Sequence, residues 1–294
     1  MNINLPCNSS IGAELTDVDA RSITAAETEE IKQLVYKHKL VVFRNHNLSK
    51  MEYIAFARMF GEPQIYLQKN YHHPDHPEIF VSSNVPENGK KVGVSGTGRY
   101  WHTDYQFHSQ PLPMTMLYPQ VLPQGKRETY YIDMEQVYSA LPADLRSYVD
   151  GKLAVHDAKW RYKITPDDID RSVIDILADV ETMVPPLTHP AVIQHPVTGR
   201  DILYISSGFT AGIVGLGYEE NREVMKQLFA FVEKPDYIYV HTWHYGDILL
   251  WDNRSLIHKA SDTPKGEPSS SYRIGIYDGV PFYAGLAVAS SAAA

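Results

Sequence analysis

Several features that identify other classes of protein are missing from this chain of 294 residues. Cysteine is nearly absent: the single residue Cys7 excludes an internal disulfide and favours a reducing, cytoplasmic location. No apolar run approaches the roughly 18 residues that a membrane-spanning helix needs. The first residues also lack the basic and apolar regions of a secretory signal. We therefore expect a protein without a membrane partner.

An excess of positive charge is missing as well. The chain has 27 Lys and Arg residues against 35 Asp and Glu residues, which gives a formal net charge of −8. Because a nucleic-acid-binding protein needs a basic surface to neutralise phosphate, we expect no nucleic-acid partner. The G-x-S-x-G motif of many serine hydrolases is absent.

Repeats and low-complexity linkers are also absent, and this bears on domain organisation. We expect one domain over residues 1–294, with a disordered tail of small residues at 285–294. The sequence leaves open whether this domain forms a homo-oligomer.

What the chain does contain is a series of helix and strand signals. Thr24 with Glu27, and Ser49, are typical of helix N-caps, and they predict helices that run to about His38 and to Phe60. An amphipathic pattern predicts a further helix at 218–231. Apolar runs predict strands at residues 40–43, 79–83, 114–117, 128–133, 201–206, 237–244 and 271–276. Strands predominate, so we expect a mixed, mainly β fold.

Two stretches between these elements are polar. The loop at 63–76 contains His72, His73 and His76, but their spacing matches no standard metal site, so we expect an ordered loop that covers a pocket. Residues 84–98 are polar and rich in glycine, which predicts a mobile segment able to close over a neighbouring site.

A possible metal-ligand motif follows directly, in residues 100–105. If this stretch is a strand, His102 and Asp104 project from the same face and Thr103 faces away. One imidazole and one carboxylate are two members of the 2-His-1-carboxylate set, which holds non-haem Fe(II) and leaves positions open. The tripeptide by itself fits a strand-edge histidine beside a solvated aspartate better than it fits a metal site.

The third ligand is expected far along the chain. The best candidate is His258, which follows a predicted strand and turn at 246–254. Arg273 lies on the next apolar strand, where its planar guanidinium could grip a carboxylate through two parallel hydrogen bonds. The whole constellation is much less expected by chance than the H-x-D tripeptide.

With this spacing, the chain resembles the taurine-dioxygenase (TauD/TfdA-like) family of Fe(II)/2-oxoglutarate-dependent oxygenases over residues 12–283. The resemblance implies a double-stranded β-helix, a jelly roll of two antiparallel sheets, with helices packed outside. It also implies Fe(II) as cofactor and 2-oxoglutarate and O2 as co-substrates. The implied iron ligands are His102, Asp104 and His258, and the implied partners of the distal 2-oxoglutarate carboxylate are Thr129 and Arg273.

Segments at 71–83, 156–164 and 195–205 are similar to the isonitrile-forming branch of that family. Members of this branch oxidise an N-carboxymethyl 3-amino acid to an isonitrile with loss of CO2, and they consume two molecules of 2-oxoglutarate and two of O2. The resemblance therefore implies a small-molecule carboxylate substrate. The matching substrate positions in this chain are Tyr66, Tyr71, Arg127 and Lys163.

Two departures and several alternatives stay open. Leu67 stands where the branch has a second pocket tyrosine, and Asp262 stands where it has a histidine; we expect Asp262 to repel a carboxylate. Hydroxylation or desaturation of an amino acid or related small carboxylate is therefore the alternative reaction, and a non-enzymatic binding module is a second alternative. Without the resemblance, Lys163 fits a solvated lysine, Arg127 fits a surface turn, and the two tyrosines fit loop packing.

Overall fold

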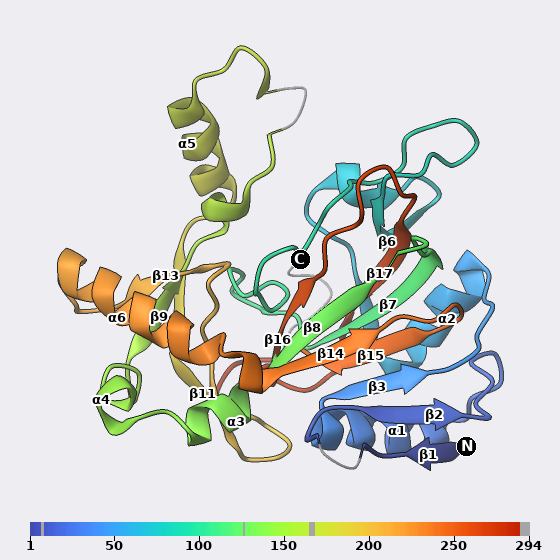
Figure 1. Cartoon of the computed structure of the whole chain (residues 1–294), viewed down its shortest axis with the longest axis horizontal. Helices are drawn as coiled ribbons and strands as arrows, with labels where there is room; N and C mark the ends of the chain where they lie inside the picture. Colours follow the sequence, from blue (N-terminus) through green and yellow to red (C-terminus); the bar gives the residue numbers. More distant parts are fainter. Residues whose placement is uncertain (7–8, 126, 165–167, 289–294) are drawn as a thin grey trace.

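The computed structural model describes residues 1–6, 9–125, 127–164 and 168–288, and its architecture is mainly β, as expected (Figure 1). Its largest part is a nine-stranded sheet. In spatial order the strands are β1 (Asn2–Asn4), β2 (Ala13–Thr16), β3 (Leu40–Phe43), β15 (Ile248–Asp252), β7 (Met114–Val121), β17 (Ser270–Tyr277), β6 (His76–Ser83) and β5 (His72–His73), with β4 (Glu62–Gln64) paired to β17.

A second sheet has three antiparallel strands in the order β14 (Ile238–Thr242), β8 (Glu128–Asp133) and β16 (Leu256–Ala260). Two smaller sheets lie beyond it: β10 (Leu187–Pro190), β9 (Leu153–His156) and β13 (Thr210–Ile213) form one, and the hairpin of β11 (Val192–Gln194) with β12 (Asp201–Leu203) forms the other.

Helices begin where the capping residues predict. Thr24 and Ser49 each accept a hydrogen bond from the third helical residue, in complete capping boxes, and so begin α1 (Ala25–His38) and α2 (Lys50–Phe60). The remaining helices are α3 (Met134–Ser139), α4 (Ala143–Arg146), α5 (Val173–Met183) and α6 (Tyr218–Val232), with short 3₁₀ turns η1 (Lys69–Tyr71), η2 (Ala158–Arg161) and η4 (Pro235–Tyr237). None of the helices in the described part of the chain has the length and apolar character needed to cross a bilayer.

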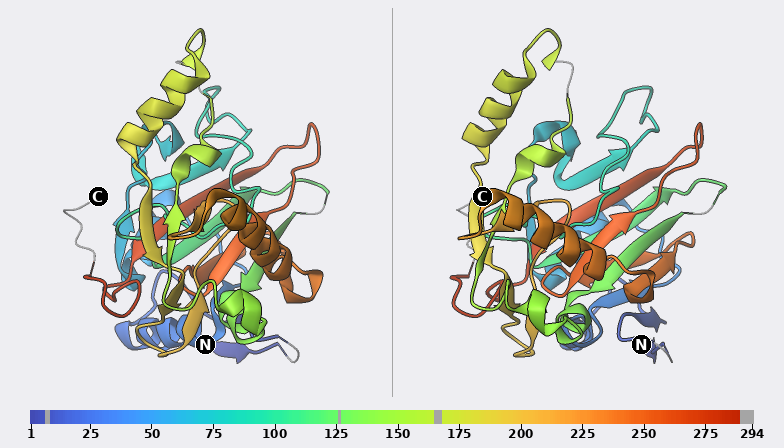
Figure 2. Two further views of the ribbon diagram at one scale, coloured as in Figure 1. Left: turned by 90° about the vertical axis from the view of Figure 1, so that its left-hand side faces the viewer. Right: turned by 60° about the vertical axis from the view of Figure 1, so that its left-hand side comes forward.

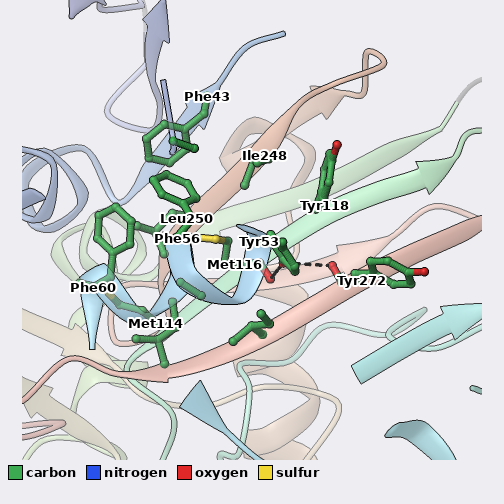
Figure 3. Close-up of a cluster of buried hydrophobic side chains, with 14 of the residues drawn as sticks. Phe43, Tyr53, Phe56, Phe60, Met114, Met116, Tyr118, Ile248, Leu250 and Tyr272 are labelled. Carbon is green, nitrogen blue, oxygen red and sulfur yellow. Dashed lines mark hydrogen bonds between the residues drawn. The ribbon is translucent and has the colours of Figure 1, made fainter. Parts of the chain in front are cut away.

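Alternation along the strands gives the large sheet two different faces. On β17, Tyr272 and Ile274 are buried in the core beneath α1 and α2, whereas Arg273 between them points to the other face. The same alternation on β7 buries Met114 and Met116 against the helices (Figure 3). One face therefore supplies the main core, and the opposite face is free to line a site.

The two larger sheets pack face to face through a second apolar cluster. Leu249 and Trp251 of β15 contact Tyr131 of β8 and Leu256 of β16 in this cluster. A third cluster joins β8 and β16 to α3, α4, α6 and the β11–β12 hairpin. Helix α5 extends away from the sheets in every view (Figures 1 and 2). Two sheets facing one another agree with the mainly β expectation, while the double-stranded β-helix stays a prediction.

Residues 84–98, predicted as a mobile segment, are packed along β6. Val92 is buried in the main core, and the backbone N–H of Val94 donates to the Val81 carbonyl at 3.1 Å. Glu87 accepts hydrogen bonds from the Lys50 ammonium and the Tyr272 hydroxyl. These contacts anchor both halves of the segment, and closure over a neighbouring site stays a prediction.

Two further expectations concern the histidine-rich loop and the tail. His73 contacts Glu87 at 3.2 Å, in agreement with an ordered loop. Of the predicted tail, residues 289–294 lie outside the described residues. Leu286 in the described portion packs against the third cluster, and the disordered tail at 285–294 stays a prediction.

The main core gives a test of stability that leaves the opposite face of the sheet intact. Phe56 of α2 is 1% exposed, and its ring lies 5.1 Å from Phe43 and 5.3 Å from Phe60. We expect Phe56→Ala to lower the free energy of unfolding by about 3–5 kcal/mol in urea denaturation, because it leaves a cavity. Met51→Ala on the exposed side of the same helix should change it by less than about 0.5 kcal/mol. Equal effects of the two substitutions would contradict this account.

Candidate metal centre

The H-x-D tripeptide does not lie on a strand, so that prediction was wrong. Of these three residues only His102 pairs, through an isolated antiparallel bridge to His258 in β16, with N–H to carbonyl distances of 3.1 and 2.7 Å. Asp104 lies in a turn that continues to Tyr105, whose φ of 58° is left-handed. Thr103 does face away, and its hydroxyl donates to the carbonyl of Asn253. A turn, and not strand alternation, therefore brings Asp104 beside His102.

The structure does bring the three expected ligand residues together. His102, Asp104 and His258 each offer one ligand atom, and these atoms lie within 4.8 Å of one another. Nε2 of His102 is 3.8 Å from Oδ1 of Asp104, and the two imidazole centroids are 4.2 Å apart. All three side chains are buried. This is the only such group among the residues that the structure describes.

Their protonation states suit a divalent metal. Burial lowers the pKa of His102 and lowers that of His258 well below its ordinary value, so both imidazoles are neutral at pH 7. Burial alone would raise the pKa of Asp104, but the Arg273 guanidinium and the two histidines outweigh it and lower this pKa to about 2. Nδ1 of His102 is 2.7 Å from the Tyr100 carbonyl and donates to it, which leaves Nε2 as a lone-pair donor. Two neutral nitrogens and one ionised oxygen fit non-haem Fe(II).

Thr129 and Arg273, expected to bind 2-oxoglutarate, line the same cavity. Nη1 of Arg273 donates to Oδ1 of Asp104 at 2.5 Å, while its buried Nε has no partner among the described residues. The Thr129 hydroxyl oxygen accepts a hydrogen bond from the indole of Trp243 at 2.9 Å, so its own O–H is left to donate. An unpaired guanidinium N–H and a free hydroxyl donor fit the carboxylate of a keto acid.

The four expected substrate residues also line this cavity: Tyr66, Tyr71, Arg127 and Lys163. Burial lowers the pKa of Arg127 and of Lys163. Nη1 of Arg127 donates to the Ser261 carbonyl at 2.7 Å, and Nζ of Lys163 donates to the carbonyls of Ser95 and Gly96. Neither cation is therefore a freely solvated surface residue.

The aromatic side chains form a wall next to Arg273. The Tyr66 ring lies 5.1 Å from the Tyr71 ring and 5.0 Å from Phe80, and the Arg273 guanidinium lies 4.1 Å from the Phe80 centroid. Burial raises the pKa of both tyrosines, so both hydroxyls are neutral donors at pH 7. The tyrosines thus pack in the loop and line the cavity as well.

Of the two departures, only Leu67 lines the cavity. The side chain of Asp262 is 85% exposed, lies outside the cavity lining and pairs with Arg99 at 3.3 Å. The Asp262 side chain therefore lies outside the cavity, and the expected repulsion between it and a bound carboxylate stays a prediction.

The sequence did not single out Trp243, Tyr100 or Arg161 as site residues. Nε and Nη2 of Arg161 donate to the carbonyls of Gly208 and Ser207, and its guanidinium lies 4.4 Å from the centre of the Tyr100 ring. Trp243 follows β14 directly, and the pairing of β14 with β8, which the sequence does not show, places it beside Thr129.

The charges that line the cavity have mostly one sign. Among the described lining residues the cations are Arg127, Arg161, Lys163 and Arg273, and the one carboxylate is Asp104. The chain as a whole has a net charge of −8, so this cavity is a positive region in an acidic protein. It favours anionic ligands.

Comparison with known proteins connects this geometry with a group of oxygenases. Residues 4–274 match the family described as Taurine catabolism dioxygenase TauD, TfdA family. The chain is 33% identical to pentalenolactone F synthase of Streptomyces avermitilis over 271 residues, which cover 88% of each protein. It is 30% identical over 265 residues to the alpha-ketoglutarate-dependent 2,4-dichlorophenoxyacetate dioxygenase of Cupriavidus pinatubonensis, covering 86% of this chain and 90% of the other.

Solved structures agree with the sequence comparison. The crystal structure of a taurine dioxygenase from Burkholderia xenovorans has a TM-score of 0.74 to this chain at 27% identity. The match covers 95% of this chain and 90% of the other.

The metal centre can be tested by absorption. Anaerobic addition of Fe(II) and 2-oxoglutarate should give a weak visible charge-transfer band, since a keto acid chelated to ferrous iron absorbs there. His102→Ala should abolish the band, because it removes one of three ligands. His244→Ala, which removes an exposed imidazole outside the cavity, should leave it unchanged. A band of full intensity in His102→Ala would exclude this residue as a ligand.

Proposed function

Because the chain belongs to the taurine catabolism dioxygenase TauD, TfdA family and is an alpha-ketoglutarate-dependent dioxygenase, we propose that it converts an N-carboxymethyl 3-amino acid to an isonitrile by oxidative decarboxylation. Fe(II), 2-oxoglutarate and O2 are the cofactor and co-substrates of this class. The observation that carries the substrate proposal is the positive cavity, with four cations against one carboxylate.

Charge balance supports a substrate with more than one carboxylate. We assign Arg273, with Thr129, to the distal carboxylate of 2-oxoglutarate. Arg127, Arg161 and Lys163 are then left for the substrate, and none of them forms an ion pair with a carboxylate among the described residues. An N-carboxymethyl 3-amino acid brings two carboxylates, which these cations can bind through charge-assisted hydrogen bonds.

The roles of the protein side chains follow from their positions. His102, Asp104 and His258 would hold the iron, which with 2-oxoglutarate would supply the oxidising chemistry for a substrate C–H bond. Tyr66 and Tyr71, with Phe80, cover the cavity beside Arg273 and exclude water there. Binding of the substrate carboxylates by the cations of the cavity would orient one of its C–H bonds toward the three ligand residues.

The stoichiometry fits the chemistry of the conversion. Turning an N–CH2–COO⁻ arm into an isonitrile releases CO2 and removes two pairs of hydrogen atoms, so it requires two oxidations with two molecules of 2-oxoglutarate. The alternative is one oxidation, by hydroxylation or desaturation of an amino acid or related small carboxylate. The relative named for 2,4-dichlorophenoxyacetate supports a small carboxylate substrate in either case.

Product analysis distinguishes the two reactions. Incubation of the Fe(II) enzyme with 2-oxoglutarate, O2 and N-carboxymethyl 3-amino acids of several chain lengths should yield, by mass spectrometry, a product that has lost CO2 and four hydrogen atoms. Two molecules of succinate should form for each molecule of isonitrile. A product that gains one oxygen and keeps its carbon atoms would refute isonitrile formation and support hydroxylation.

Substrate binding by Lys163 makes a separate prediction. Lys163→Met should raise the KM for the carboxylate substrate roughly ten- to a hundredfold, because a charge-assisted hydrogen bond contributes about 1.5–3 kcal/mol. The KM for 2-oxoglutarate should stay within about twofold, since Arg273 and Thr129 are unchanged. Lys226→Met on the exposed face of α6 is the matched control. Equal increases in both KM values would show that Lys163 acts only by holding Ser95 and Gly96.

A further inference from the structure

A buried threonine binds one of the two carboxylate oxygens of Asp104. Thr115 of β7 is fully buried, and its Oγ1 lies 2.5 Å from Oδ2 of Asp104. Strand alternation explains this position, because Met114 and Met116 on either side point into the main core. Oδ1 is the oxygen that lies 3.8 Å from Nε2 of His102. The two carboxylate oxygens therefore have different surroundings.

The threonine is the middle of a chain of hydrogen bonds. Nε1 of Trp251 is 2.8 Å from Oδ1 of Asn253, and Nδ2 of Asn253 is 2.8 Å from Oγ1 of Thr115. Trp251 and Asn253 are each 1% exposed, so water does not compete with these bonds. The chain ends at Oδ2 of Asp104.

The donors and acceptors in this series of hydrogen bonds can be assigned in only one way. An indole N–H can only donate, so the Asn253 side chain must present its oxygen to Trp251 and its NH2 group to Thr115. The Thr115 oxygen thus accepts from Asn253, and its single proton is left for Oδ2 of Asp104. A carboxylate that is ionised can only accept, in agreement with this assignment.

We propose that Thr115 is a positioning residue, which binds Oδ2 of Asp104 so that the carboxylate offers only Oδ1 to the metal. This inference rests on the proposed role of Asp104 as an iron ligand. Oδ1 can accept from Arg273 and still present a second lone pair. Single-oxygen ligation leaves a coordination position open, whereas a carboxylate free to turn could occupy it with Oδ2.

Asn253 and Trp251 also contact the segments that carry the other two ligand candidates. The Asn253 carbonyl accepts the hydroxyl of Thr103, between His102 and Asp104, and the Trp251 ring packs edge-on against His258 at 4.9 Å. One buried tryptophan–asparagine pair therefore contacts the segments that carry all three ligand candidates. Residues that orient metal ligands in this way typically change metal affinity ten- to a hundredfold when substituted.

The test compares two substitutions at one position. Thr115→Val has nearly the same shape but no hydroxyl, and Thr115→Ser keeps the hydroxyl. By titration with Mn(II), which needs no turnover, we expect Thr115→Val to bind the metal about ten- to a hundredfold more weakly and Thr115→Ser to bind within about threefold of the unsubstituted protein. The Fe(II)–2-oxoglutarate band should shift in Thr115→Val and return in Thr115→Ser.

Two further variants complete the design. Thr28→Val makes the same chemical change at a buried threonine of α1, remote from the metal centre, and should leave both readouts unchanged. Trp251→Phe keeps a ring against His258 but removes the N–H that donates to Asn253, so it should also weaken Mn(II) binding. It replaces Thr115→Val in the test if that variant does not fold.

Each outcome decides between the hypotheses. Unchanged Mn(II) affinity and band in Thr115→Val, or in Trp251→Phe where that variant replaces it, would overturn the positioning role while leaving the metal centre intact. Equal weakening by Thr115→Ser and Thr115→Val would also overturn it, because packing and not the hydroxyl would then matter. Absence of metal binding and of the band in the unsubstituted protein would overturn the metal centre itself, and this inference with it.

Discussion

The candidate site depends on one short backbone pairing, the antiparallel bridge between His102 and His258. Two hydrogen bonds join these residues across more than half the chain and set their imidazoles 4.2 Å apart. No extended strand supports His102 at this point, since the chain turns at Asp104. The Thr103 hydroxyl on the Asn253 carbonyl adds a further tie. Because such long-range contacts cost loop-closure entropy, the apolar packing of both sheets must stabilise them.

That packing comes from strands that serve the core on one face and the site on the other. In β17, Arg273 points to the cavity, while its neighbours Tyr272 and Ile274 point to the core. In β7, Thr115 points to Asp104, while Met114 and Met116 point to the core. Antiparallel pairing of β17 with β7 holds both polar residues at fixed positions beside Asp104. The precision of the site is thus a property of the strands, which are more rigid than the loops around it.

Local signals predicted local structure well, and contacts between distant segments poorly. The capping boxes at Thr24 and Ser49 placed α1 and α2 because they are self-contained within four residues. The sequence predicted correctly that His102 and Asp104 lie together, but it assigned them to a strand instead of a turn. Strand alternation cannot predict the positive φ of Tyr105, where the chain turns. Trp243 and Thr115 could not be assigned from the sequence, because their roles depend on which strands lie side by side.

The cations of the cavity differ from the buried cations elsewhere in the fold. Arg254 is paired with Asp278, and Lys39 with Asp133, so each of these two buried cations meets a carboxylate. Arg127, Arg161 and Lys163 instead donate to backbone carbonyls, which orient a charge without neutralising it. Burial lowers the pKa of Arg127 and of Lys163, and a bound anion would favour the charged form of both side chains. Three cations that are oriented by backbone carbonyls and form no ion pair among the described residues favour a ligand that carries its own negative charges, in agreement with the proposed substrate.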